Sequence, residues 1–223
     1  MKIKTIITGA TGMVGEGVMH ECLNHPDIEK VLVINRRSGN VKHPKLEEII
    51  HNNFFDFTPL ENRLKGYNAC YFCLGTTSVG KKEDVYTKMT FDITKALADI
   101  LVKLNPDMTF CYISGAGTDS TEKGKIMWAR VKGRTENYIL NLGFKQAFAF
   151  RPAIISPTKG LKNTLSFYKY LFFLLPVIKL FFPKHICSLK EIGLAMINSV
   201  NKGYEKNVLE VEDIVKLAEQ SQN

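Results

Sequence analysis

Three glycines near the start of the chain have the spacing of a phosphate-binding turn. They form a G-x-x-G-x-x-G pattern directly after an apolar run and directly before a helical pattern. In such a turn the glycines allow a tight reversal, close approach of the backbone to a pyrophosphate, and close packing of helix on strand. The helix N-terminus then faces the phosphates. The pattern predicts a dinucleotide site lined by Gly9, Thr11, Gly12, Met13, Val14 and Gly15.

The end of the second apolar run indicates which dinucleotide binds. The run from Val31 to Asn35 is followed by Arg36 and Arg37, with no acidic residue to accept a hydrogen bond from a free ribose 2′-hydroxyl. Guanidinium groups donate paired hydrogen bonds that suit a 2′-phosphate. The sequence therefore favours NADP(H) over NAD(H). The alternative for either arginine is a place on the solvent side of a loop.

These residues need a scaffold, and strand-like runs alternate with helical patterns as in a doubly wound parallel sheet, the Rossmann fold of the α/β class. The expected strands are residues 3–8, 31–35, 46–50, 69–74, 109–114 and 146–151. The expected helices are residues 13–24, 83–104, 125–142, 188–201 and 213–220. In the second helix an i, i+4 stripe predicts the face that covers the sheet, formed by Val85, Met89, Ile93, Leu97 and Leu101.

A chain of 223 residues suits a single domain, and residues 157–187 are expected to form a variable lid or small substrate lobe. This region contains a stretch rich in Phe, Leu and Tyr, residues 165–183. Its longest uncharged piece, residues 170–178, is far shorter than the roughly 20 residues that span a bilayer. We expect no transmembrane segment. A peripheral membrane contact or an oligomer contact stays open, and so does the oligomeric state.

Composition narrows the partners and the compartment. The net charge of +8 suits anionic ligands, but the basic residues are spread along the chain without a nucleic-acid-binding motif, so no nucleic acid partner is predicted. Five cysteines without a signal peptide favour a reducing cytoplasm. Cys70 and Cys73 lie three apart on an apolar strand and should point to opposite faces. They are interpreted as core residues, and no metal site is expected.

Several further motifs lie beyond the glycine turn. Starting at Thr8, Cys73, Ile113, Val131 and Arg151, they read TGATGMVG, CLGTT, ISGA, VKG and RPA. With these motifs the chain resembles the atypical short-chain dehydrogenase/reductases of the epimerase-like NAD(P)-binding superfamily, in particular the Tat-interacting oxidoreductase-like branch. The resemblance implies an oxidoreductase or epimerase-like enzyme that acts on a small carbonyl or hydroxyl substrate.

The resemblance also implies positions along the cofactor. Two residues would lie beside the adenine, three would follow the dinucleotide, and two would pass near the nicotinamide: Asp56 and Phe57; Leu74, Gly75 and Thr76; Pro152 and Ala153. All lie near the carboxyl ends of expected strands, where open α/β sheets bind ligands. The alternative for Asp56 is a turn cap before Pro59.

The catalytic set of the resembled family is a Ser, a Tyr and a Lys, with the Tyr four residues before the Lys. Ser114 and Lys132 match, and the resemblance gives Lys132 a second role on the nicotinamide ribose. Trp128 stands in place of the Tyr. An indole N–H donates a hydrogen bond but is no general acid near neutral pH. Tyr138 lies six residues beyond Lys132, too far round the helix to replace position 128. Tyr112 shares the strand face of Ser114, but a core role is the preferred interpretation. A non-catalytic redox sensor or regulatory protein is therefore the alternative function.

Overall fold

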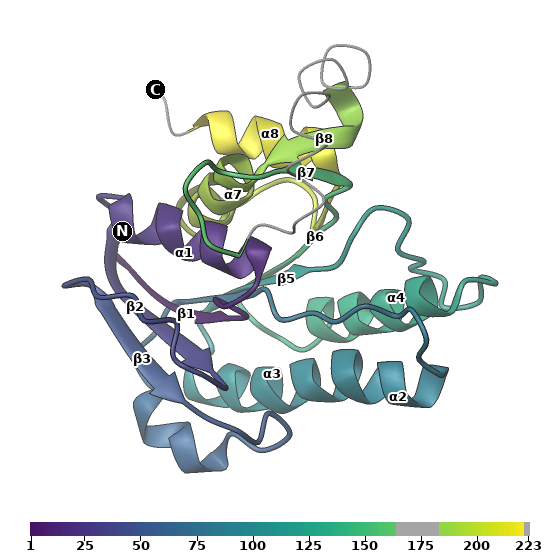
Figure 1. Ribbon diagram of the computed structural model, residues 1–223, viewed down its shortest axis with the longest axis horizontal. Coiled ribbons are helices and arrows are strands. Elements are labelled where there is room, and N and C mark those ends of the chain that lie inside the picture. The colour runs from purple at the N-terminus through teal and green to yellow at the C-terminus, as the bar shows by residue number, and fades with distance from the viewer. Residues whose placement is uncertain (164–182, 221–223) are drawn as a thin grey trace.

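The computed structural model describes residues 1–163 and 183–220, and these form a parallel sheet between two layers of helices (Figure 1). The main sheet has seven strands in the order β3-β2-β1-β4-β5-β6-β9. Their bounds are β1 (Ile3–Thr8), β2 (Ile28–Asn35), β3 (Leu46–Ile50), β4 (Ala69–Phe72), β5 (Thr109–Ile113), β6 (Gln146–Phe150) and β9 (Val208–Leu209). The strand order reverses between β1 and β4, which opens a crevice at their carboxyl ends. The predicted doubly wound α/β fold is confirmed.

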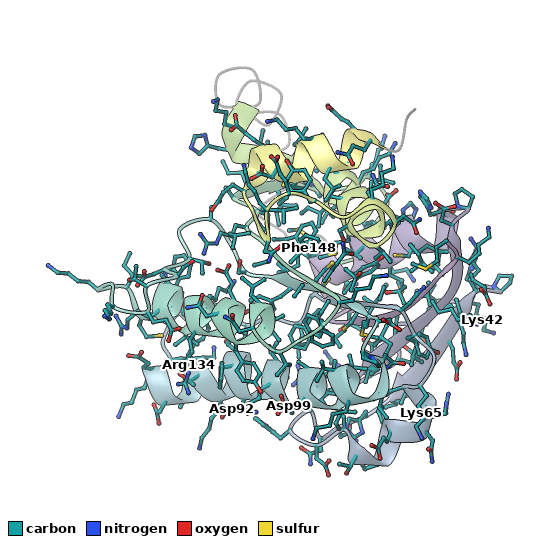
Figure 2. The ribbon with its side chains drawn as sticks, turned by 180° about the vertical axis from the view of Figure 1, so that it is seen from behind. Lys42, Lys65, Asp92, Asp99, Arg134 and Phe148 are labelled. Carbon is teal, nitrogen blue, oxygen red and sulfur yellow. The ribbon has the colours of Figure 1, made fainter. Side chains whose placement is uncertain are left out.

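Helices cover both faces of the sheet, and helices far apart in the sequence share a face (Figure 1). One face is covered by the first helix and the last two, which are α1 (Met13–Asn24), α7 (Leu189–Lys202) and α8 (Val211–Glu219). The helix α4 (Met127–Leu140) lies on the other face. Two hydrophobic cores result: the first core lies between the sheet and α1, α7 and α8, and the second core lies on the face covered by α4. Because side chains alternate along a strand, Ile7 of β1 lies in the first core and Ile6 in the second. Figure 2 shows Phe148 of β6 between the layers.

The expected helix at residues 83–104 contains a π-helical turn. It consists of α2 (Glu83–Thr87), the π-helical turn η2 (Lys88–Asp92) and α3 (Ile93–Leu104). A π turn accommodates an extra residue and so shifts the faces of the helix on either side. Leu97 and Leu101 of the predicted stripe are fully buried, whereas Val85 is 42% exposed and Tyr86 is buried in its place. The expected burial of Val85 was therefore wrong.

Three short strands were not predicted from the sequence. One is β9, and the others are β7 (Ile154–Ser156) and β8 (Ile186–Ser188), which pair in parallel as a separate two-stranded sheet. Two or three residues are too few for a periodic pattern to show. Of the longer strands, β1 and β3 have the predicted bounds, and β2 begins three residues earlier than predicted, at Ile28. β4 ends two residues earlier, at Phe72, and β5 and β6 each end one residue earlier.

The expected lid at residues 157–187 lies mainly on residues 164–182, outside the described part of the chain, as does nearly all of the stretch at 165–183. Its two described flanks are both anchored. Before the gap, the buried carboxylate of Glu16 in α1 accepts hydrogen bonds from the backbone N–H groups of Lys162 at 2.8 Å and Asn163 at 2.7 Å. After the gap, β8 pairs with β7. No helix in residues 1–163 or 183–220 is long and apolar enough to cross a membrane.

Candidate functional site

The three glycines of the predicted turn have different structural reasons to be glycine. Gly9 has a positive φ of 73°, and a Cβ there would lie 2.7 Å from the backbone of Cys73. A Cβ at Gly15 would lie 2.1 Å from the carbonyl oxygen of Gly9. At Gly12, where φ is −105°, the nearest atom to an added Cβ is 3.4 Å away. The fold itself therefore requires Gly9 and Gly15, while a Cβ at Gly12 would make only a van der Waals contact at the start of α1.

Gly12 stands at the N-terminus of a helix. Gly12 is the N-cap of α1 and makes no side-chain cap. The backbone N–H groups of a first helical turn have no partner inside the helix, and they attract anions. The turn at residues 9–15 therefore has the geometry of a pyrophosphate site.

A pocket of about 200 Å³ opens at the same edge of the sheet, next to this turn, because the backbone N of its lining residue Leu74 would lie 2.7 Å from a Cβ added to Gly9. It brings together Arg36, which follows β2, and the three residues after β4 that were predicted to follow the dinucleotide, Leu74, Gly75 and Thr76. The rest of its lining comes from the loop after β3 and from the helix beyond β4: Asn52, Phe54, Phe55, Met89 and Ile93. In the loop after β3, Asp56 and Phe57 were predicted to contact the cofactor, whereas Asn52, Phe54 and Phe55 were not. Their place at the end of a neighbouring strand was the available signal.

Asp56 and Phe57 are not part of this lining. Phe57 is fully buried in the second core, with its ring edge-on to Phe54 at 5.4 Å between centroids. Asp56 is exposed, and its Oδ1 accepts hydrogen bonds from the Thr58 hydroxyl at 2.7 Å and the Thr58 N–H at 2.9 Å. Those bonds lower the pKa of Asp56. They close a local turn just before the 3₁₀ helix η1 (Thr58–Arg63), as in the turn alternative, although the N-cap of that helix is Phe57.

The two arginines after β2 are exposed, and within residues 1–163 and 183–220 neither guanidinium has an acidic partner. Arg36 lines the pocket, whereas Arg37 does not. The preceding Asn35 is buried, and its amide donates a hydrogen bond of 2.9 Å to the carboxylate of Glu48. Arg36 and Arg37 therefore remain available for an anionic ligand.

The predicted catalytic residues meet at the carboxyl end of β5. The hydroxyl of Ser114 donates to the carbonyl oxygen of Phe150 at 3.1 Å. The Lys132 ammonium donates to the carbonyl oxygen of Ser114. Burial lowers the pKa of Lys132 to about 8, although Glu136, one turn further along α4, opposes this shift. The site thus holds a lysine that titrates close to neutral pH.

The loop after Ser114 completes this end of the site. The N–H of Ala116 donates to the carbonyl oxygen of Pro152 at 2.9 Å, so the expected nicotinamide residues Pro152 and Ala153 follow a strand next to Ser114. The hydroxyl of Thr118 donates to the carbonyl oxygen of Gly115 at 2.7 Å. The hydroxyls of Ser114 and Thr118 therefore both donate to backbone oxygens.

Trp128 lies on the first turn of α4, one helical turn before Lys132. Its indole lies over the loop after β5, since a Cβ added to Gly117 would be 3.5 Å from the ring. Tyr112 is buried in the second core, and burial raises its pKa. The hydroxyl of Tyr138 donates a hydrogen bond to Asp99 and accepts one from Lys95, both on α3. Neither phenol takes the place of Trp128.

A buried ion pair holds α4 against the sheet beside Lys132. The fully buried carboxylate of Glu136 accepts from Arg151 Nε at 3.0 Å and Nη2 at 2.5 Å. Ser120 and Glu210 accept further hydrogen bonds from the same guanidinium. A buried pair with such geometry is costly to break from one side. It therefore fixes the helix that carries Lys132.

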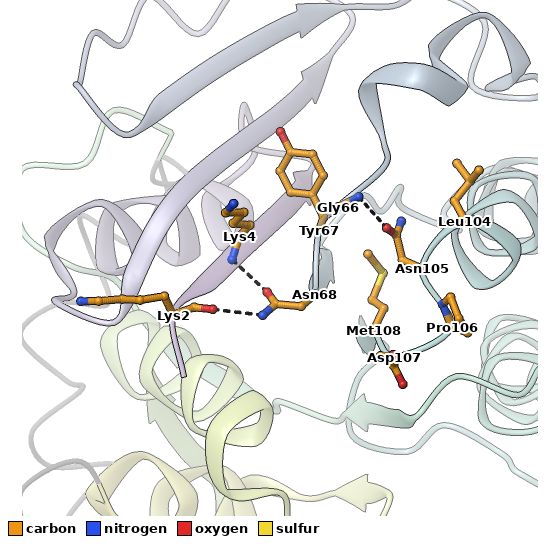
Figure 3. Close-up of a pocket in the computed structure, with 10 residues that line it drawn as sticks. All are labelled: Lys2, Lys4, Gly66, Tyr67, Asn68, Leu104, Asn105, Pro106, Asp107 and Met108. Carbon is orange, nitrogen blue, oxygen red and sulfur yellow. Dashed lines mark hydrogen bonds between the residues drawn. The ribbon is translucent and has the colours of Figure 1, made fainter.

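A larger pocket of about 460 Å³ lies at the opposite edge of the sheet, near the amino ends of β1, β4 and β5 (Figure 3). Asn68 links its walls: its Oδ1 accepts from the Lys4 N–H at 2.9 Å, and its Nδ2 donates to the Lys2 carbonyl oxygen at 3.0 Å. The ammonium of Lys4 pairs with Glu29 at 3.2 Å. These polar groups hydrogen-bond or pair with neighbouring strands and loops. We therefore assign the candidate ligand site to the carboxyl edge of the sheet and not to this pocket.

All five cysteines are free thiols. Cys70 lies in the second core, and Cys73 packs against the first, as expected for opposite faces. In the described part of the chain no three His, Cys, Asp or Glu side chains gather as metal ligands would.

Solved structures share this fold. The UDP-N-acetylglucosamine 4-epimerase from Bacillus cereus superposes with a TM-score of 0.67 at 16% identity, over 96% of this chain and 84% of that one. The enzyme WbmF of Bordetella bronchiseptica, solved in complex with NAD+, gives a TM-score of 0.65 at 12% identity, over 100% and 79%. At this level of identity the likeness establishes the fold alone.

Sequence relatives and a family model go further. The chain is 30% identical over 156 residues to Protein FMP52, mitochondrial, of Chaetomium globosum, which covers 67% of this chain and 65% of that protein. It is 28% identical over 156 residues to Protein HTATIP2 of Rattus norvegicus, which covers 67% and 61%. Both matches span less than two thirds of the relative. The model of the NAD dependent epimerase/dehydratase family matches residues 5–132, which include the glycine turn and Lys132. This chain therefore belongs to the NAD dependent epimerase/dehydratase family, among the NAD(P)-binding atypical short-chain dehydrogenase/reductases.

Proposed function

We propose that this protein is an NADP(H)-dependent oxidoreductase that acts on a small carbonyl or hydroxyl substrate. In this proposal the pyrophosphate binds at the start of α1, the adenosine occupies the pocket lined by Arg36 and residues 74–76, and the nicotinamide lies beside Lys132 and Pro152. All of these positions share the carboxyl edge of the sheet, where the strand order reverses.

One observation carries the preference for NADP(H). Arg36 and Arg37 are exposed directly after β2, while the side chain of Asn35 is turned to Glu48. A 2′-phosphate would gain charge-assisted hydrogen bonds from the arginines. A bare 2′-hydroxyl would find no carboxylate on residues 35–37.

Titration of NADPH and NADH into the wild type and into an Arg36→Ala, Arg37→Ala double variant tests this preference. We expect the wild type to bind NADPH more tightly, and the double variant to lose about tenfold or more of that preference. Equal or tighter binding of NADH by the wild type would overturn the assignment. So would a preference that survives both substitutions.

The reaction itself depends on what surrounds the nicotinamide. The bound cofactor supplies or accepts the hydride. Of the predicted catalytic residues, Lys132 is the one that can exchange a proton near neutral pH, because its pKa lies at about 8. Ser114 can accept a hydrogen bond at its hydroxyl oxygen, while its proton is directed to Phe150. We therefore assign proton transfer at this end to Lys132, directly or through water.

A second function, a non-catalytic dinucleotide sensor or regulatory protein, is favoured by one specific observation. Trp128 replaces the expected phenol, and the hydroxyls of Ser114 and Thr118 both donate to backbone oxygens. Turnover of a panel of aldehydes and ketones with NADPH separates the two functions. Measurable turnover that Lys132→Met abolishes supports the enzyme, whereas tight NADPH binding without turnover supports the sensor.

Three coarser expectations belong to the same proposal: a single domain, a lid formed by residues 157–187 over the substrate, and a cytoplasmic location. The anchored flanks of that segment support the lid, and the five free thiols support the location.

The FMP52 relative is mitochondrial by name. Fractionation of the native cell decides the location. Salt-resistant flotation of the folded protein with lipid vesicles would instead favour a membrane role for the segment.

A further inference from the structure

The carboxylate of Glu48, on β3, organises the loop that carries Arg36 and Arg37. Its Oε1 accepts hydrogen bonds from the Asn35 amide at 2.9 Å and from the backbone N–H of Gly39 at 2.9 Å. Its Oε2 accepts from the hydroxyl of Ser38 at 2.6 Å. One carboxylate thus binds residues on both sides of the arginine pair.

The remaining contacts of this loop are few. Ser38 also accepts a hydrogen bond from the N–H of Asn40 at 3.1 Å, and Asn40 has a positive φ of 53°. Residues 36–38 and 40 are exposed. Because an exposed loop without buried apolar contacts is held mainly by its hydrogen bonds, the bonds to Glu48 decide its conformation.

Glu48 is suited to this role by its charge and its direction. Burial alone would raise its pKa, but the bonds from Ser38, Gly39 and Asn35 outweigh burial and hold that pKa below its usual value. The group is therefore an ionised acceptor at neutral pH, and hydrogen bonds to ionised groups are the stronger ones. Glu48 does not line the adenosine pocket, whereas Arg36 does. The carboxylate thus acts on the loop from outside the ligand space.

We propose that Glu48 is a positioning residue for cofactor specificity, which holds Arg36 and Arg37 where they recognise a 2′-phosphate. This inference rests on the proposed preference for NADP(H). A carboxylate at the end of β2 would bind a free ribose 2′-hydroxyl and so favour NAD(H). Glu48 has the opposite role, because it does not bind the ribose and supports 2′-phosphate binding indirectly.

The test compares two ligands that differ only in the 2′-phosphate, adenosine 2′,5′-bisphosphate and AMP. Isothermal titration of each into wild type and Glu48→Gln measures the ratio of their dissociation constants. We expect the wild type to prefer the bisphosphate, and Glu48→Gln to reduce that preference about tenfold while AMP binding stays unchanged. Ser38→Ala removes one of the bonds and should reduce the preference less.

Glu47 gives a matched control on the same strand. Its side chain pairs with Lys30 at 2.6 Å and with Arg63, away from the arginine loop. Glu47→Gln should leave the preference unchanged, and a melting curve for each variant shows whether it is folded. If Glu48→Gln does not fold, Ser38→Ala alone decides the question.

The outcomes separate this inference from the function on which it rests. A wild type that does not prefer the bisphosphate overturns the proposed NADP(H) preference itself. A wild-type preference that both Glu48→Gln and Ser38→Ala retain overturns the role of Glu48 and leaves the NADP(H) preference intact. A selective loss of AMP binding in Glu48→Gln also overturns it, because Glu48 would then accept from the ribose 2′-hydroxyl directly.

Discussion

The two ends of the candidate site are built in different ways. At the end proposed for the phosphates the important groups belong to the backbone, namely Gly12 and the N–H groups at the start of α1, which has no side-chain cap. At the nicotinamide end they are side chains whose directions decide the chemistry, namely Ser114, Trp128 and Lys132. In the proposed binding mode the fold alone supplies what a pyrophosphate needs at the first end, whereas the second end departs from the Ser, Tyr and Lys arrangement expected from the resemblance.

If the proposed binding mode holds, this contrast means that cofactor binding and catalysis are specified by different parts of one site. Anion binding by a helix N-terminus depends on main-chain N–H groups, which any sequence with the right glycines supplies. Proton transfer depends on a particular group with a suitable pKa at a particular position. A change at position 128 can therefore alter turnover while cofactor binding is retained.

The largest effect is expected from restoring a phenol at the nicotinamide end. In Trp128→Tyr the new hydroxyl would lie one turn from the Lys132 ammonium, which would lower the pKa of the phenol. Positioned acid catalysis is typically worth about a hundred- to ten-thousand-fold. We expect carbonyl reduction with NADPH to rise by about a hundredfold or more over a low wild-type rate, as measured by the loss of NADPH absorbance.

Trp128→Phe is the matched control, since it removes the indole without supplying an acid. It should not raise turnover. Rapid reduction by the wild type, or an equal rise in both variants, would show that the missing phenol does not limit the chemistry.

At the phosphate end, Gly12→Val should abolish dinucleotide binding in a protein that remains folded. The side chain would fill the space that the pyrophosphate needs, and the protein itself has room for a Cβ at this position. We expect NADPH affinity to fall by about a hundredfold or more, a loss of about 2.7 kcal/mol. Calorimetric titration and circular dichroism together measure binding and fold.

Gly75→Ala controls for the loss of a glycine, because nothing lies within 4 Å of an added Cβ there. This smaller substitution should leave the fold intact and reduce affinity much less. Normal NADPH binding by folded Gly12→Val would place the pyrophosphate elsewhere.

Features that depend on local sequence patterns could be predicted, whereas features that depend on tertiary structure could not. The glycine turn and the order of the long elements depend on local patterns, so the bounds of β1, β3 and α1 agree with the prediction. The outward turn of Val85 depends on a π turn, which leaves no periodic signal. The hydrogen bond from Ser114 to Phe150 joins the residue after β5 to the last residue of β6. Only the folded sheet brings that pair together, so residue identity at position 114 could not reveal it.

The adenosine pocket gives an intermediate test, with Phe55 and Phe57 as a natural pair. Phe55 is 55% exposed and lines the pocket, whereas Phe57 is fully buried. Phe55→Ala should weaken NADPH binding about tenfold through lost contact with the base and leave the melting temperature nearly unchanged. Phe57→Ala should cost about 3–5 kcal/mol of stability. If Phe57→Ala weakened NADPH binding and Phe55→Ala instead lowered the melting temperature, the adenine would be assigned to Phe57 as first predicted.

The smallest expected effect is a pH dependence of cofactor binding that comes from Lys132. Its lowered pKa of about 8 means that the ammonium, which would donate to the nicotinamide ribose, is present below pH 8 and is lost as pH rises through that value. The NADPH dissociation constant should therefore increase about threefold to tenfold between pH 7 and pH 9. The second ionisation of a phosphate lies near pH 6, so the ligand does not titrate in this window. Lys132→Met should bind more weakly at pH 7 with a flat profile. An unchanged slope in that variant would assign the titration to another group, and a flat wild-type profile would mean that the Lys132 charge does not contribute to binding.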